Sequence, residues 1–338
     1  MLPTMTAVEG RPERVSFWPE TVFKAVPNGQ CAGVIRAIDG LHETVTKSPG
    51  QRVYGFHDIV HNTQVVGDFE RKGVTFSDNL DEVPDGSTVM FSAHGVSPSV
   101  VREAQSRGMK IIDATCPLVD KVHREVEEYA KLGFTIILIG HKGHDEAIGT
   151  KGVAPEQTVL IETLEEAENL EVEDPEKVAL TTQTTLSVED TKAIREALIR
   201  KFPKLAEPKK SDICYATQNR QDAVKEMVRQ GAQAVVVVGS PNSSNSNRLR
   251  EVGDETLRRR GRPEISVMID DVKELDELAY QFEGLNIVGV TSGASVPSEK
   301  LNEVIEWFKK HGTQNVRDIN LPNVDESRMR FAPISTSL

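Results

Sequence analysis

Short apolar runs rich in Val, Ile and Leu alternate with longer stretches of mixed apolar and charged residues along most of the 338-residue chain. Each apolar run ends in a polar segment that often contains glycine. Continuous apolar runs are typical of strands buried in parallel sheets, and their alternation with helical stretches indicates βα units. The pattern therefore predicts an α/β fold.

The three cysteines of the chain mark an internal repeat. Cys31, Cys116 and Cys214 stand in "GQCAGV", "ATCPLV" and "DICYAT", where the pattern changes to a helical one. We therefore expect each cysteine at a strand-to-helix corner, with Pro117 at the first helical position. Each following helix carries a basic residue five or six positions after its cysteine. These residues are Arg36, Lys121 and Arg220.

Three strands follow each cysteine in the same order. The first strands with their polar loops span 52–62, 134–146 and 233–247. The second strands, which lead into acidic stretches, span 74–78, 159–163 and 267–271. The last strands with their loops span 89–95, 178–185 and 287–295.

The repeat predicts three similar small modules, because its period is longer than that of solenoid repeats. In open parallel sheets, ligands bind beyond the carboxyl ends of the strands, which is where all nine polar segments lie. We therefore expect a pseudo-threefold trefoil in which the thiols and loops meet at one centre. The predicted parts are an N-terminal extension at 1–20, modules at 21–115, 116–213 and 214–311, and a C-terminal tail at 312–338.

Composition and charge exclude several classes of protein. The chain has 52 acidic and 40 basic residues and a net charge of −12, which argues against a general nucleic-acid binder. No apolar run approaches the roughly 20 residues of a membrane span, and the N-terminus lacks the apolar core of a signal peptide. Three cysteines are too few for a disulfide scaffold. We expect a cytoplasmic protein that binds neither nucleic acid nor membrane.

Three cysteines at helix N-termini indicate a metal centre. The N–H groups and dipole of a helix N-terminus stabilise a thiolate, which is a metal ligand. Structural zinc normally adds a fourth ligand and a close C-x-x-C pair, and the sequence has no such pair. The count fits a [4Fe–4S] cluster in which one iron has no protein thiolate. A three-iron cluster and a Cys₃ zinc site fit the count as well.

Histidine-containing and Ser/Asn-rich segments supply further candidates. His57 and His61 in "HDIVH" are spaced as in zinc proteases, but that motif requires a helix and this stretch follows a strand. We therefore expect His61 to face the centre and His57 to be structural. "GHKGHDE" offers His144 as a cation and Glu146 as an acid or base. The loops 92–97, 239–247 and 291–295 offer hydroxyl, amide and N–H donors to phosphate.

Eight motifs match one known enzyme family closely. They are "HNxxVV" (61–66), "FSAHGVS" (91–97), "DATCPLVxKVH" (113–123), "IGHKGHDEAIGT" (139–150), "TQTTLSVEDT" (182–191), "DICYATQNRQ" (212–221), "VVVGSPNSSNSNRL" (236–249) and "GVTSGAS" (289–295). On these motifs the chain resembles, from about residue 27 to about residue 300, the 4-hydroxy-3-methylbut-2-enyl diphosphate reductases of the non-mevalonate isoprenoid pathway. The resemblance implies a three-lobed α/β fold around a central [4Fe–4S] cluster.

The resemblance also implies a role for each matching residue. Cys31, Cys116 and Cys214 would hold one cluster per chain, and its open iron would bind the substrate hydroxyl. Glu146 and Thr184 would lie beside that hydroxyl, with Glu146 as the proton source and His144 as a further catalytic group. The diphosphate would be bound, in part by imidazolium charge, by His61, His94, His144, Ser243, Ser244, Asn245 and Ser295.

In this family, two electrons from a ferredoxin- or flavodoxin-like donor pass singly through the cluster. The products are isopentenyl diphosphate and dimethylallyl diphosphate. Two other classes stay open on the residues alone. One is a zinc-dependent hydrolase that uses the three cysteines or the His57–His61 pair, and the other is a non-catalytic protein that binds a phosphorylated metabolite.

Two parts of the chain depart from the family pattern. Many relatives carry Arg and Phe just before the first cysteine, whereas this chain has Pro27-Asn28-Gly29-Gln30. The resemblance therefore does not define the packing and polarity beside Cys31. The N-terminal extension and the final segment, "RFAPISTSL" (330–338), match no family motif. We expect them either to lie over a neighbouring module or to be disordered.

Overall fold

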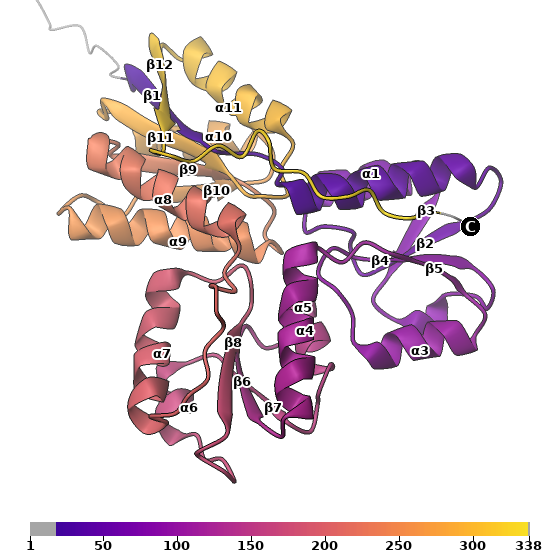
Figure 1. The fold of residues 1–338 in the computed structure, drawn as a ribbon. Coiled ribbons are helices and arrows are strands. Elements are labelled where there is room, and N and C mark those ends of the chain that lie inside the picture. The colour runs from indigo at the N-terminus through magenta and orange to yellow at the C-terminus, as the bar shows by residue number, and fades with distance from the viewer. Residues whose placement is uncertain (1–17, 337–338) are drawn as a thin grey trace, which may run out of the picture.

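A computed structural model describes residues 18–336, in which three parallel sheets with flanking helices form three lobes that meet at the centre of the molecule (Figure 1). The predicted α/β class and the three small modules are therefore confirmed. The extension predicted at 1–20 lies largely outside the described residues. Between residues 18 and 336, none of the helices has the length and apolar character needed to cross a lipid bilayer.

Sheet B forms the first lobe and has the strand order β3-β2-β4-β5. Its strands are β2 (Val53–Phe56), β3 (Val74–Ser77), β4 (Thr88–Phe91) and β5 (Lys110–Asp113). Helix α1 begins directly after Cys31 and buries Ala37 and Leu41 against this sheet. The helical elements are α1 (Ala32–Lys47), α2 (Thr63–Glu70), the 3₁₀ turn η1 (Leu80–Glu82) and α3 (Pro98–Ser106).

Sheet C forms the second lobe and has the order β7-β6-β8. Its strands are β6 (Thr135–Ile139), β7 (Thr158–Ile161) and β8 (Val178–Thr182). Ala206 adds a single parallel bridge to Ala179 of β8, so a short extended segment borders this edge of the sheet. The helices are α4 (Pro117–Lys131), α5 (Asp145–Lys151), α6 (Leu164–Asn169) and α7 (Val188–Lys201).

Sheet A forms the third lobe and has the order β10-β9-β11-β1-β12. Alternate residues of the central "AVVVV" strand are buried on opposite faces, because helices cover both. The strands are β1 (Thr21–Val26), β9 (Ala234–Val238), β10 (Ser266–Ile269), β11 (Ile287–Ser292) and β12 (Asn315–Asn320). The helical elements are α8 (Tyr215–Gln230), α9 (Ser244–Arg259), α10 (Glu274–Leu278), η2 (Ala279–Phe282) and α11 (Ser298–Lys310).

The segment before each cysteine pairs with the sheet of the preceding lobe. β5, before Cys116, lies in sheet B, and the Ala206 bridge, before Cys214, lies beside sheet C. β1, before Cys31, lies between β11 and β12 of sheet A. The repeat assigned residues 21–26 to the module 21–115, but this strand is part of the sheet of the third lobe. The sequence order did not reveal this pairing, because β1 and β11 are separated by most of the chain.

All nine strands predicted from the repeat are present, but β12 was not predicted. It lies within the segment 312–338 that was expected to be a tail. Its sequence, "NVRDIN", has a single buried residue, Ile319, because the strand forms an edge of sheet A. The apolar pattern that marks the other strands is therefore missing.

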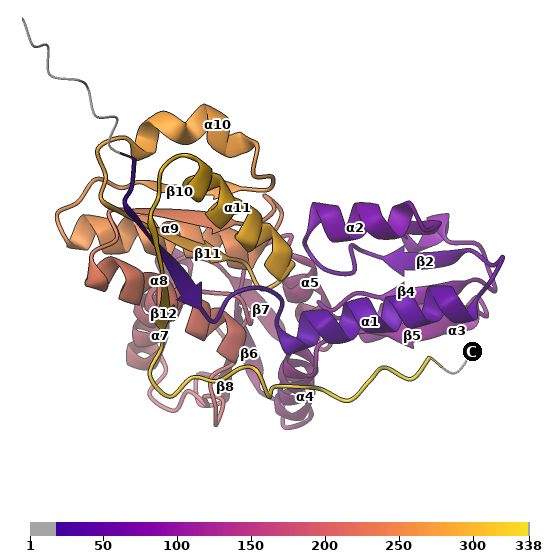
Figure 2. The same ribbon diagram turned by 90° about the horizontal axis from the view of Figure 1, so that it is seen from above.

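The residues after β12 cross from the third lobe to the first and run along α1 (Figures 1 and 2). Ile334 is buried in the core between α1 and sheet B. It lies so close to Gly40 of α1 that a Cβ atom at Gly40 would be 2.6 Å from Ile334 Cδ1. Lys47 Nζ donates to Thr336 Oγ1 at 3.1 Å. The tail therefore lies over a neighbouring module, which is one of the two arrangements expected from the sequence.

Candidate active site

The carboxyl ends of the three sheets border one central pocket of about 680 Å³ that opens to solvent. All twelve residues that the sequence nominated line this pocket. They come from all three lobes and are separated by up to 264 positions in the chain. The residues are Cys31, His61, His94, Cys116, His144, Glu146, Thr184, Cys214, Ser243, Ser244, Asn245 and Ser295.

Each cysteine is the N-cap residue of a helix, as the sequence predicts. Cys31 caps α1, Cys116 caps α4 with Pro117 at the first helical position, and Cys214 caps α8. The Cys214 sulfur also accepts the N–H of Thr217 at 3.4 Å. The three thiols therefore lie where unpaired N–H groups and helix dipoles favour negative sulfur.

A backbone hydrogen bond attaches each cysteine to a loop of another lobe. The N–H of Cys31 donates to the carbonyl oxygen of Ala294 at 3.0 Å, after β11. The N–H of Cys116 donates to Ala93 O at 2.9 Å, after β4, and that of Cys214 to Thr184 O at 3.0 Å, after β8. The same bond is thus made three times, always to the loop after the last predicted strand of a module.

Gly33 shows how closely two of the thiols approach. A Cβ atom at Gly33 would be 2.7 Å from Cys116 Sγ and 3.9 Å from Cys31 Sγ, so a larger residue would enter the space between them. Burial raises the pKa of Cys116 to about 12 and that of Cys214 to about 11. The buried sulfurs therefore need a compensating positive charge to be thiolates. Three sulfur donors around one pocket fit a soft metal centre.

Glu146 is a buried carboxylic acid in the first turn of α5. Its Oε1 accepts the N–H of Thr184 at 2.6 Å, and its Oε2 lies 3.1 Å from Thr184 Oγ1. Burial raises the pKa of Glu146 to about 7, although the two hydrogen bonds from Thr184 act in the opposite direction. Glu146 is therefore close to half-protonated at neutral pH, which suits a general acid.

His144 caps α5, and its contacts define its tautomer. Nδ1 accepts the N–H of Glu146 at 3.1 Å, so the proton of the neutral ring must be on Nε2. Nε2 is buried in the pocket without a protein partner. Burial lowers the pKa of His144 to about 3. His144 therefore offers the pocket a neutral N–H donor.

His61 and His94 stack on each other with ring centroids 3.9 Å apart, and the ring of His144 lies nearly perpendicular to both. Burial is the main cause that lowers the pKa of His61, and it lowers that of His94 well below its usual range. The imidazolium charge implied by the family resemblance is thus disfavoured when the pocket holds no anion. A bound anion would raise these pKa values, because it stabilises the charged rings.

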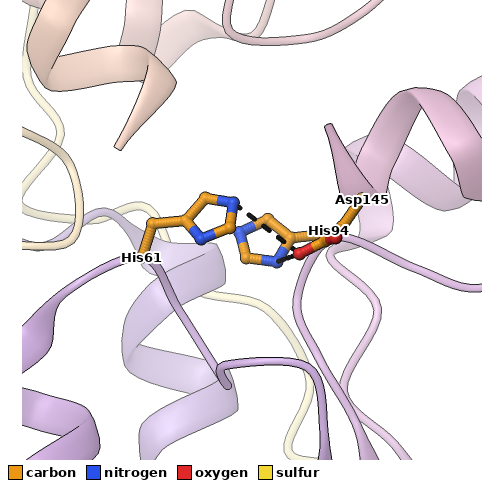
Figure 3. Close-up of side chains that lie close together, drawn as sticks. All are labelled: His61, His94 and Asp145. Carbon is orange, nitrogen blue, oxygen red and sulfur yellow. Dashed lines mark ion pairs between the residues drawn. The ribbon is translucent and has the colours of Figure 1, made fainter. Parts of the chain in front are cut away.

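Asp145 faces these histidines and was not nominated from the sequence (Figure 3). It is the first residue of α5, in the second lobe, whereas the histidines come from loops of the first lobe. Its Oδ2 lies 4.0 Å from both His61 Nε2 and His94 Nδ1, and its Oδ1 lies 3.5 Å from His57 Nδ1. Its charge acts to raise the pKa of His61. The one sequence feature that could have indicated Asp145 is its position directly before Glu146.

His57 lies outside the pocket lining. The stretch 57–61 forms bends and not a helix, so the zinc-protease interpretation is wrong. The His57 ring packs on Phe56, with centroids 4.1 Å apart, and Nδ1 lies 2.9 Å from Asp78 Oδ1. These contacts agree with the structural role expected for this residue.

The Ser/Asn-rich segment begins a helix. Ser243 caps α9 and accepts the N–H of Ser246 at 3.3 Å. Asn245 accepts the N–H of Ala294 at 3.0 Å, and Ser295 Oγ donates to the carbonyl oxygen of His61 at 2.9 Å. The Asn245 bond joins the N-terminus of α9 to the loop after β11, and the Ser295 bond joins that loop to the first lobe. The result is a set of fixed donors at a helix N-terminus, which is an anion-binding arrangement.

Known proteins with similar sequences cover most of the chain. The family model described as LytB protein matches residues 22–309. A 4-hydroxy-3-methylbut-2-enyl diphosphate reductase of Rhodopirellula baltica is 47% identical over 90% of this chain and 94% of its own length. The reductase of the same name from Acidothermus cellulolyticus is 48% identical over 88% of this chain and 85% of its own length.

Solved structures also resemble this fold. That of the E-1-hydroxy-2-methyl-but-2-enyl-4-diphosphate reductase from Plasmodium falciparum has a TM-score of 0.84 and 33% sequence identity, and covers 92% of this chain and 95% of that chain. A second structure, of an (E)-4-hydroxy-3-methyl-but-2-enyl diphosphate reductase, has a TM-score of 0.59 and 30% identity, and covers 86% of this chain and 99% of that chain.

The contacts of Asp145 predict a change in histidine titration. In Asp145→Asn, the pKa of His61 should fall further below its usual value, because the carboxylate no longer stabilises the charged ring. NMR titration of the ring C–H signals measures this. Asp120→Asn is the control, since Asp120 acts on His123 and should leave His61 unchanged. An unchanged titration of His61 in Asp145→Asn would contradict the coupling.

Proposed function

The chain belongs to the LytB protein family, and we propose that it is a 4-hydroxy-3-methylbut-2-enyl diphosphate reductase. The proposed reaction removes the allylic hydroxyl group reductively and gives isopentenyl diphosphate and dimethylallyl diphosphate. One observation carries the proposal. Thiols from three helix N-termini line the same pocket as the Glu146–Thr184 pair and a set of anion donors.

The proposed cofactor is one [4Fe–4S] cluster held by Cys31, Cys116 and Cys214. Three features of the residues fit this group: the three capping positions, the space kept open by Gly33, and buried thiols that require a positive charge nearby. When bound, the cluster supplies single electrons and a Lewis-acidic iron for the substrate hydroxyl.

The proposed diphosphate site is made of the other polar residues that line the same pocket as the thiols. His144 would donate from Nε2, and His61 and His94 would add charge as the anion raises their pKa values. The N-terminus of α9 would contribute backbone N–H groups and dipole charge. The remaining donors would be the side chains of Ser243, Ser244 and Asn245, together with that of Ser295 once its hydroxyl turns from the carbonyl oxygen of His61 to the anion. Burial of the site strengthens each of these interactions, since water competes less for the anion.

Glu146 and Thr184 form a proton path in this proposal. Because Oε1 of Glu146 accepts a backbone N–H, the acidic proton is placed on Oε2. In the carboxylate form Thr184 Oγ1 donates to Oε2, 3.1 Å away. In the protonated form this bond would reverse, so that Oε2 donates to Thr184 Oγ1 and the threonine hydroxyl donates to the substrate hydroxyl. A proton delivered there lets the hydroxyl leave as water, which is a better leaving group than hydroxide.

The physiological reductant in this proposal is a ferredoxin- or flavodoxin-like protein, and the enzyme acts in the cytoplasm.

The reductase and the alternative zinc-dependent hydrolase differ in simple observations. Anaerobically purified reductase should be brown, with broad absorption near roughly 400 nm, and should form the two C5 diphosphates when a chemical one-electron reductant is added. Colourless protein that holds zinc and cleaves the substrate without reductant would support the hydrolase.

The role of Glu146 as proton source can be tested by substitution. Glu146→Gln should keep the cluster and the affinity for substrate but lower turnover by about 10²-fold or more, because a general acid is lost. Wild-type turnover should fall as pH rises through about 7, where Glu146 loses its proton. The variant should lack this fall. Iron content, substrate affinity and turnover from pH 5.5 to about 8.5 test the prediction; full activity of the variant would remove Glu146 as proton source.

Thr184 offers a matched pair of variants. Thr184→Ser keeps the hydroxyl and should retain most activity, whereas Thr184→Val keeps the shape and should lose about 10²-fold in turnover, since the proton path is broken. Turnover at saturating substrate distinguishes the two. Equal activity of the Ser and Val variants would show that the hydroxyl moves no proton.

The thiol assignment predicts the metal content of three variants. Each of Cys31→Ser, Cys116→Ser and Cys214→Ser should lower iron and sulfide well below four atoms of each per chain, because one of three ligands is weakened. Metal analysis and absorption spectra measure the loss, and circular dichroism checks that the variants fold. A complete, active cluster in any one variant would break the assignment.

A further inference from the structure

Arg36, Lys121 and Arg220 occupy equivalent positions, one and a half turns into the three helices that the cysteines cap. Their side chains have no place in the pocket lining described above. Each side chain instead contacts the segment that precedes the next cysteine in the chain, and the contact of the last helix returns to the segment before the first cysteine. The three contacts therefore form a closed cycle.

Arg36, on α1, contacts the segment before Cys116. Its Nη1 donates to the carbonyl oxygens of Ala114 at 3.4 Å and Thr115 at 3.1 Å. Its Nε donates to the carbonyl oxygen of Ala332, in the tail, at 2.9 Å. The first helix is thereby attached to the two residues that lead into the second cysteine.

Lys121, on α4, contacts the segment before Cys214. Its Nζ donates to the carbonyl oxygen of Lys210 at 3.3 Å and to Asp212 Oδ1 at 2.7 Å. The Asp212 carboxylate is fully buried, and its other oxygen accepts the Thr181 hydroxyl at 2.9 Å and the Thr182 N–H at 3.1 Å. Lys121 therefore connects α4 to the segment before Cys214 and, through Asp212, to the end of β8.

Arg220, on α8, contacts the segment before Cys31 and so closes the cycle. Its Nη2 donates to the carbonyl oxygens of Gly29 at 2.6 Å and Asn28 at 3.5 Å. The side chain is fully buried, and its charge is balanced by Glu326 of the tail, whose Oε2 lies 3.2 Å from Nη1. A buried cation with a buried counter-charge is costly to rearrange, which fixes this loop firmly.

We propose that Arg36, Lys121 and Arg220 are positioning residues that form a ring around the thiol centre, each holding the loop of the next cysteine against the preceding cysteine-capped helix. The ring sets the spacing of the three sulfurs before a metal is present. This inference rests on the tri-thiolate centre of the proposed function, because the ring has no role without it.

The pattern of contacts distinguishes the ring from ordinary ion pairs. Arg124 and Lys131 lie on the same helix as Lys121, but they pair with carboxylates one turn away on that helix. Lys121 also pairs with Glu125 one turn away. Unlike the two controls, each ring member in addition joins the helix of one cysteine to a backbone carbonyl oxygen that lies one to four residues before the next cysteine. Such groups behind metal ligands typically change metal affinity by about 10- to 100-fold when removed.

The test compares Arg36→Met and Lys121→Met with Arg124→Met and Lys131→Met in the full-length chain. After anaerobic cluster reconstitution, iron release to an excess of chelator is timed. Before reconstitution, Cd²⁺ alone is titrated, with sulfur-to-metal absorption reporting thiolate binding. We expect the ring variants to release iron about tenfold faster and to bind Cd²⁺ about tenfold more weakly. The two control variants should match the wild type.

Thermal unfolding of the metal-free proteins separates positioning from general stability. Ring variants that lose metal affinity but unfold near the wild-type temperature support the proposal, and Lys121→Arg should restore part of the affinity. Wild-type affinity and release rates in both ring variants would overturn it, and so would losses fully matched by lower stability. If the wild type itself does not bind Cd²⁺ through three thiolates, the proposed metal centre fails, which is a separate outcome.

Discussion

The structure depends on one hydrogen bond made three times, from the N–H of a cysteine to the carbonyl oxygen of a loop in another lobe. Each cysteine starts a helix that packs on the sheet of one lobe, while its amide donates to a loop of the preceding lobe in the cycle. Three small sheets thereby share one point, although each has a separate core. A central site built in this way needs every lobe, since the removal of one lobe would remove a thiol and a set of pocket residues together.

The pocket combines groups whose ordinary protonation states are changed by the same cause. Burial raises the pKa of Glu146 and of two thiols and lowers those of the histidines, so each group favours its neutral form. With these side chains neutral, they contribute little charge to the pocket. A metal cation among the thiols would stabilise thiolates, and an anion beside the histidines would stabilise imidazolium. Binding of such groups would therefore be coupled to ionisation of the protein.

Much of this arrangement could be predicted from the sequence. Apolar runs identified nine strands, and the changes of period at the cysteines identified three helix starts, because both signals are local. The pairing of β1 with sheet A could not be predicted, since the order of the repeats does not say which sheet the segment before a cysteine joins. β12 was missed because one buried residue, Ile319, gives no pattern. Asp145 was missed because its partners come from another lobe, and neutral histidines were missed because burial is a property of the assembled pocket.

The position of β1 has a consequence for how the protein is made. Its neighbours, β11 and β12, are synthesised 266 and 294 residues later, so the N-terminal strand emerges from the ribosome long before the sheet that will receive it. Two lobes can fold as they appear, in the usual vectorial order. Cys31 reaches its final place only when translation is nearly finished. A nascent chain that ends before β11 therefore lacks the partner of Cys31 and cannot assemble all three sulfurs.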